Sequence, residues 1–184
     1  MDRQNIGLYF IALIPPEELR KRVKTLKEEM KVRFNAGHAL KSPAHITLQM
    51  PFKRNHNDEV DMVAALEEFV SHEKPFPIDL NGFSCFLPRV IFVKITDHTS
   101  IVNLQSRLGA VLINNLDFDP KSINPRLHPH MTIATRDLEK ESFYRAWSEF
   151  ESRQFQGSFL SSSMALLKHN GRCWDLFREF PFGS

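Results

Sequence analysis

Two short histidine–threonine motifs carry the residues most suited to chemistry. The tetrapeptides "HITL" (45–48) and "HMTI" (130–133) share the pattern His-x-Thr-x and lie in different halves of the chain. Each sits in a run where apolar and polar residues alternate, the pattern of a β-strand with one buried face. Because residues two apart on a strand point to the same side, His45 projects with Thr47, and His130 projects with Thr132.

Two imidazoles facing one cleft can act as a general acid and a general base. The ordinary histidine pKa of about 6.5 allows both protonation states near neutrality. A threonine hydroxyl is a short, rigid donor that suits the non-bridging oxygens of a phosphate. We therefore predict in-line attack on a phosphodiester, with His45 and His130 as acid and base, Thr47 and Thr132 binding phosphate, and no metal ion.

The same strand parity extends the predicted site. It adds Gln49 to the first face, and it adds His128 and Arg136 to the second face if that strand stays regular. We expect all three to contact substrate. The pair His128 and His130 could alternatively ligate a metal, because His-x-His on a strand is a known ligand arrangement. No Asp or Glu accompanies that pair within either motif, so a cleft-lining His128 is the preferred interpretation.

Length and composition set limits on the class of protein. The chain of 184 residues, 42% of them apolar, fits one domain over 1–184. Its 24 basic and 22 acidic side chains are well mixed, which argues against a long duplex partner but allows a small anion or a nucleic-acid end. Two cysteines, Cys85 and Cys173, are too few for a disulfide framework and are interpreted as small core residues. The apolar run 7–14 is too short to span a membrane, so we expect a cytoplasmic protein with no membrane partner.

Hydrophobic periodicity predicts an α+β fold of strands joined by helices, with mainly antiparallel sheets. The doubled motif further predicts two lobes related by a pseudo-two-fold axis, with the sheets lining a central cleft and the helices outside. Strands are expected over 7–14, 45–52, 76–86, 89–95, 128–136, 159–169 and 173–182, and helices over 15–34, 58–72, 98–116 and 138–152.

Three further groups of residues have a structural and a functional interpretation. The basic run "RKRVKTLK" (20–27) is interpreted as a solvated helix face rather than an RNA track, because glutamates flank it. Phenylalanines 10, 52 and 118 are candidates for stacking on a nucleobase. The histidines outside the motif segments are interpreted as surface residues: His38, His56, His72, His98 and His169.

The motifs in their context resemble the 2H phosphoesterase superfamily, which includes RNA 2′,3′-cyclic phosphodiesterases of the LigT type, also called 2′-5′ RNA ligases. The resemblance rests on "PAHITLQMPF" and "LHPHMTIATR", with "GLYFIALIPP" near the start and "RCWDLFREFPF" near the end. It implies a bilobal fold and cofactor-independent opening of a cyclic phosphate to the 2′-phosphate. By the same analogy His45 would protonate the leaving 3′ oxygen and His130 would activate water, although pseudo-symmetry allows swapped roles. Many members carry an arginine five residues after the second histidine, where this chain has Thr135 followed by Arg136.

The sequence thus leads to one main hypothesis and two rivals. The main hypothesis is a monomeric, metal-independent phosphodiesterase that hydrolyses a 2′,3′-cyclic phosphate on a nucleotide or RNA end, with 2′-5′ RNA ligation as a further reaction. The first rival is a non-catalytic nucleotide-binding module that uses the same cleft. The second is a metal-dependent hydrolase built on His128 and His130.

Overall fold

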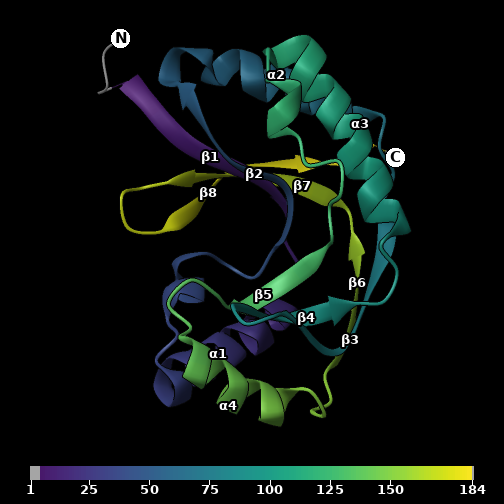
Figure 1. The fold of residues 1–184 in the computed structure, drawn as a ribbon. Helices are drawn as coiled ribbons and strands as arrows, with labels where there is room; N and C mark the ends of the chain where they lie inside the picture. Colours follow the sequence, from purple (N-terminus) through teal and green to yellow (C-terminus); the bar gives the residue numbers. More distant parts are fainter. Residues whose placement is uncertain (1–4, 184) are drawn as a thin grey trace.

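A computed structural model describes residues 5–183 and shows a two-lobed α+β architecture (Figure 1). Eight strands and four helices alternate broadly as the periodicity predicts. The strands are β1 (Ile6–Leu13), β2 (Ile46–Asn55), β3 (Phe76–Phe86), β4 (Val90–Ile95), β5 (His130–Ala134), β6 (Gln156–Ser161), β7 (Ser163–His169) and β8 (Trp174–Pro181). The helices are α1 (Glu17–Phe34), α2 (Glu59–Ser71), α3 (Thr99–Leu116) and α4 (Lys140–Phe150), with short 3₁₀ turns η2 (His38–Lys41), η3 (His56–Asp58) and η4 (Pro120–Ser122).

The strands form two four-stranded sheets in which every pairing is antiparallel. Sheet A has the order β2-β1-β7-β8, and sheet B has the order β5-β4-β3-β6. The two orders correspond strand by strand, so β2 and β5 occupy equivalent edges and β1 and β4 lie beside them. The strands that carry the two motifs, β2 and β5, contact one another across the gap between the sheets. The predicted bilobal fold is confirmed.

Two helices pack against the sheet that does not contain the strands they connect. Helix α1 connects two strands of sheet A but packs against β5 of sheet B, whereas α3 connects two strands of sheet B and contacts β2. Helix α4 joins α1 on one side of the molecule, and α2 joins α3 on the other (Figure 1). Each half of the chain therefore contributes one helix to the other lobe, and one large hydrophobic cluster spans both lobes.

Alternate side chains of strand β1 point to opposite faces of sheet A. Tyr9, Ile11 and Leu13 are fully buried in the main core, while Phe10 and Ala12 on the opposite face join a small separate cluster with residues of β7. Burial of side chains of this size contributes roughly 1.5–3 kcal/mol each, which fixes the register of the strand. The second face of sheet A is thus an apolar floor beneath His45.

Three expectations about elements and burial need correction. The single strand expected over 159–169 is two strands in different sheets, β6 and β7, which separate at Ser162. The strand expected over 128–136 is limited to His130–Ala134. Cys173 is exposed and Cys85 is only half-buried, so neither is a core residue. Among residues 5–183, no helix is long and apolar enough to cross a membrane.

Candidate active site

The two motif histidines have matching local geometry. His45 immediately precedes β2, and its Nδ1 lies 2.8 Å from the carbonyl oxygen of Pro43. His130 opens β5, and its Nδ1 lies 2.6 Å from the carbonyl oxygen of His128. A carbonyl oxygen can only accept, so in both rings Nδ1 carries the proton and donates. Each neutral imidazole therefore keeps its lone pair on Nε2, the nitrogen that is free to meet a substrate.

Each imidazole also rests on a phenylalanine of the neighbouring strand. The ring centroids of His45 and Phe10 are 4.8 Å apart with an interplanar angle of 50°, and those of His130 and Phe92 are 4.9 Å apart at 51°. Phe10 comes from β1 and Phe92 from β4, which are equivalent strands of the two sheets. The pseudo-symmetry of the fold thus extends to the backbone and aromatic supports of both histidines.

Burial lowers the pKa of both histidines. It lowers the pKa of His45 to about 4, against the opposing effect of the Pro43 carbonyl, and the charges of Lys27 and His130 lower it further. It also lowers the pKa of His130, opposed by the carbonyl of His128. At neutral pH both imidazoles are therefore uncharged in the free protein.

The two motif threonines are placed beside the histidines by the same strands. Thr47 lies in β2 opposite Ala12, and Thr132 lies in β5 opposite Phe92. Both are partly exposed. Within residues 5–183 neither hydroxyl forms a hydrogen bond, so both are available to a ligand. The strand parity that predicted the two His-Thr pairs matches this arrangement.

Three other predicted site residues lie where strand regularity fails. Gln49 follows a register shift in β2 and is buried, with its amide donating to the carbonyl of Ser122 at 3.1 Å. His128 lies before β5 and stacks near His130 at a centroid distance of 6.3 Å. Arg136 lies beyond the end of β5 with φ of 59°, so the parity argument does not apply to it. Its charge instead acts on His38, whose pKa is lowered by burial and then by Arg136.

Comparison with known proteins decides the family. Residues 15–172 match the family model described as the 2′-5′ RNA ligase superfamily. The chain belongs to this superfamily. Two curated relatives are Putative phosphoesterase GK0864 of Geobacillus kaustophilus, 27% identical over 180 residues (96% of this chain and 96% of that protein), and Putative phosphoesterase BH1439 of Halalkalibacterium halodurans, 24% identical over 182 residues (96% and 98%).

Solved structures support the same assignment at the level of the fold. TT0787 of Thermus thermophilus superposes with a TM-score of 0.67 at 22% identity, covering 96% of this chain and 99% of that one. E. coli LigT in its apo form superposes with a TM-score of 0.68 at 14% identity, covering 98% and 99%. Family and fold together identify a LigT-like 2H phosphoesterase.

The sequence interpretation missed Lys27, which is linked to His45 through a shared backbone carbonyl. It belongs to the basic run taken as solvated, yet its side chain is 2% exposed. Its Nζ donates to the carbonyl oxygens of Ser42 at 3.0 Å and Pro43 at 3.1 Å, so the Pro43 carbonyl accepts from both Lys27 and His45. Burial lowers the pKa of Lys27 to about 8. The spacing from Val23 to Lys27 was the available signal, since it places the lysine beside the buried stripe of α1.

The aromatic and histidine predictions around the 2H site have mixed outcomes. Phe10 is buried beneath His45, while Phe52 and Phe118 pack against each other at 4.8 Å near the core. Phe10 and Phe118 are buried, whereas Phe52 is partly exposed. His98, expected as a plain surface residue, packs on His128 at 4.8 Å.

Another expected surface histidine, His56, belongs to a hydrogen-bonded group on sheet A. Its Nδ1 lies 2.7 Å from the Glu59 carboxylate and 3.0 Å from the Tyr9 hydroxyl. Lys168 binds the same carboxylate at 2.7 Å. Within residues 5–183, no three His, Cys, Asp or Glu side chains are grouped so that they could hold a metal ion.

Proposed function

We propose that this phosphoesterase opens a 2′,3′-cyclic phosphate on a nucleotide or RNA end to the 2′-phosphate, using His45 and His130 without a metal ion. The observation that carries the proposal is the matched pair of imidazoles. Each has its Nδ1 proton held by a backbone carbonyl and its Nε2 free, and each has a threonine hydroxyl two residues further on. Such a pair can take a proton on one side of a phosphorus atom and supply one on the other.

The proposed reaction balances as an in-line displacement. Nε2 of His130 takes a proton from water, the water oxygen forms a bond to phosphorus, and the bond from phosphorus to O3′ breaks. Nε2 of His45, protonated in the substrate complex, gives its proton to the departing O3′. The phosphate anion favours that protonation, and the low intrinsic pKa of His45, about 4, then makes it a strong proton donor. Thr47 and Thr132 donate to the phosphoryl oxygens.

The other predicted residues take supporting roles in the proposal. Gln49 holds the segment around Ser122 through its amide, and the His128 carbonyl orients His130. In this proposal Arg136, beyond the end of β5, attracts the anionic substrate by its charge. Nucleotides as the ligand class agree with structures of E. coli LigT complexed with 3′-AMP, with ATP and with NADP+.

The test is turnover of 2′,3′-cyclic AMP and of the dinucleotide ApA ending in a 2′,3′-cyclic phosphate, in EDTA, with the product isomers separated by chromatography. His45→Asn and His130→Asn should each reduce kcat by about 100-fold to 10,000-fold, the usual contribution of a general acid or base. His72→Asn is the matched control, because His72 is exposed and, among the described residues 5–183, its side chain pairs only with Glu68. Circular dichroism of each variant checks that the fold is retained.

Three outcomes would contradict the proposal. Full activity in either site variant would remove that histidine from the mechanism. Loss of parent activity in EDTA would favour a metal-dependent hydrolase at His128 and His130. Saturable nucleotide binding with no product after long incubation would favour a non-catalytic binding module. Two imidazoles that are uncharged in the free protein are also compatible with such a module.

A further inference from the structure

Lys94 lies on the strand beside the second motif, directly opposite His130. Strands β4 and β5 pair with Lys94 facing His130 and with Phe92 facing Thr132. Residues that face each other in an antiparallel pair project to the same side of the sheet, with their Cβ atoms about 4.5–5.5 Å apart. The preceding residue, Val93, is buried in the main core. Lys94 therefore projects from the opposite face of sheet B, together with His130.

The charge of Lys94 is not used by the surrounding protein. Its side chain is exposed and, among residues 5–183, forms no ion pair. No residue of β3 (Phe76–Phe86) faces it in register, because the pairing of β3 and β4 shifts at that point. Strand β4 lies inside the sheet, between β5 and β3, so Lys94 does not protect a free edge, which is a common role of lysines in strands. The ammonium is thus free to contact a ligand in front of the sheet.

The equivalent position in the other lobe shows that the fold does not require a lysine. The two motif threonines face Ala12 in β1 and Phe92 in β4. Two residues further along the chain these strands lead to Ile14 and Lys94. Ile14 packs on the small apolar cluster of sheet A. An apolar residue therefore satisfies the architecture at this position, and Lys94 adds a positive charge to the His130 side alone.

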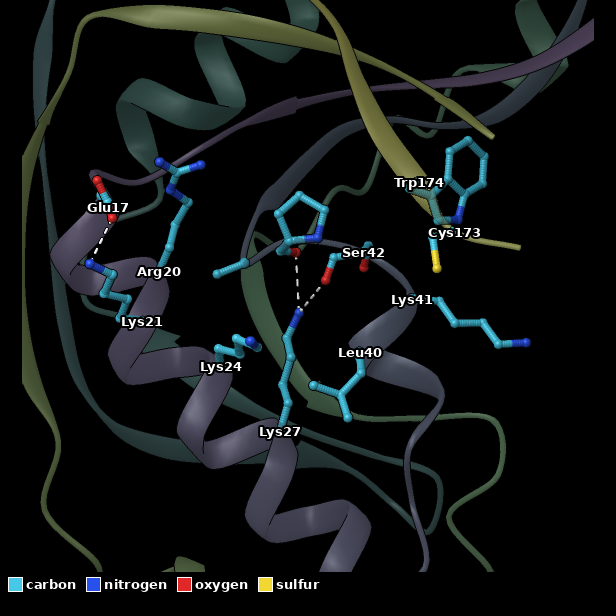
Figure 2. Close-up of a pocket in the computed structure, with 12 residues that line it drawn as sticks. Glu17, Arg20, Lys21, Lys24, Lys27, Leu40, Lys41, Ser42, Cys173 and Trp174 are labelled. Atoms are coloured by element: carbon cyan, nitrogen blue, oxygen red, sulfur yellow. Dashed lines mark hydrogen bonds and ion pairs between the residues drawn. The ribbon is translucent and has the colours of Figure 1, made fainter. Parts of the chain in front are cut away.

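The proposed reaction needs a positive charge close to phosphorus, where negative charge builds up as the new bond forms. The motif threonines and, in the free protein, both motif imidazoles are uncharged at neutral pH. Figure 2 shows that the ammonium of Lys27 is already held, by hydrogen bonds to the carbonyl oxygens of Ser42 and Pro43. Arg136 lies beyond the end of β5. Lys94, in contrast, projects from a strand directly beside His130.

We propose that Lys94 binds the phosphoryl group on the His130 side of the site and stabilises the negative charge that develops there during the reaction. This inference rests on the proposed function, because it assumes that the phosphate lies between His45 and His130. The Lys94 ammonium donates to a non-bridging phosphoryl oxygen and keeps its proton, so the proton transfers remain those of the two histidines. A flexible lysine suits this contact, since its point charge can follow the phosphoryl group as the geometry at phosphorus changes.

The kinetic test measures turnover of 2′,3′-cyclic AMP in EDTA. Lys94→Gln removes the charge and should lower kcat/KM by about 10-fold to 100-fold, the usual size of a charge-assisted hydrogen bond. Lys94→Arg keeps the charge and should recover most of that loss. Lys31→Gln is the control, because it removes an exposed charge from α1 and should keep the parent value. A merely structural role for Lys94 predicts equal losses in the Gln and Arg variants, and that result would contradict the proposal.

A binding test separates failure of this inference from failure of the proposed reaction. Isothermal titration calorimetry compares 3′-AMP with adenosine, which lacks the phosphate. Lys94→Gln should weaken the binding of 3′-AMP by about 10-fold or more and leave that of adenosine unchanged, and this result supports the contact even if no cyclic phosphate is turned over. Equal 3′-AMP affinity in parent and Lys94→Gln, or no 3′-AMP binding by the parent, would overturn the inference. Parent activity that His130→Asn abolishes would in that case show that the reaction proceeds without Lys94.

Discussion

Replacing Lys27 by methionine tests whether a buried, unpaired ammonium underlies the site. The substitution keeps the length and apolar stem of the side chain and removes the charge. It also removes the donor to the carbonyls of Ser42 and Pro43, which lowers stability by an amount independent of pH. The informative quantity is therefore the change of unfolding free energy with pH, compared between parent and variant.

The size of that pH effect follows from the two pKa values. Burial lowers the pKa of Lys27 from 10.5 to about 8 in the folded protein. The unfolded chain therefore binds more protons than the folded chain between these values, and stability rises with pH across that window. At about 1.4 kcal/mol for each pKa unit, the whole effect is about 3 kcal/mol. Between pH 7.0 and pH 9.5 the parent should recover about 2 kcal/mol of it.

Urea unfolding at pH 7.0, 8.0, 9.0 and 9.5 measures this difference. Subtraction of the Lys27→Met curve from the parent curve cancels the other groups that titrate there, including Cys85. Lys31→Met, an exposed lysine of the same helix, should show the parent dependence. Parallel curves for parent and Lys27→Met would refute a buried Lys27 ammonium. The acid limb of kcat/KM should also move to higher pH in Lys27→Met, because the charge of Lys27 lowers the pKa of His45.

Two further predictions concern the supports of the site. Burial would raise the pKa of Glu59, but hydrogen bonds from Lys168, Tyr9 and His56 lower it to about 2, so the ionised carboxylate stabilises the fold above pH 4.5 and loses that effect toward pH 2. Glu59→Gln should thus unfold more easily in urea at pH 7, with the deficit about 2 kcal/mol smaller at pH 3. Asp137 accepts from two backbone N–H groups at the start of η2, at 2.9 and 2.8 Å. Asp137→Ala should lower stability by about 1 kcal/mol and speed amide hydrogen exchange over 37–41.

Local patterns predicted the position of most strands and the faces that carry the two His-Thr pairs. The alternation around His45 and His130 depends only on neighbours along the chain, and the predicted faces with Thr47 and Thr132 follow from strand geometry alone. The same locality explains the failures. A register shift before Gln49 and a left-handed residue at Arg136 change which way a side chain points, and neither leaves a clear mark in the residue types.

Burial that depends on distant segments could not be predicted in this way. Lys27 reads as part of a charged helix face, and only the passage of 42–44 over α1 places its ammonium against two carbonyls. The exchange of α1 and α3 between the lobes is likewise a property of the assembled fold. Arg20 lines a cavity between α1, the η2 segment and the β7–β8 hairpin, and this too depends on segments distant in the sequence.

These non-local contacts are what make the two halves of a symmetric site unequal. Both histidines have the same carbonyl partner two residues back and the same phenylalanine beneath, so the strands alone would give them equal proton affinities. Lys27 lies behind His45, whereas His128 and His98 lie beside His130. The charge of Lys27 lowers the pKa of His45, whereas the neighbouring imidazoles act on His130, so the two motif histidines have different electrostatic surroundings. In the proposed reaction, this difference would suit His45 to donate a proton to the leaving oxygen and His130 to act as the base toward water.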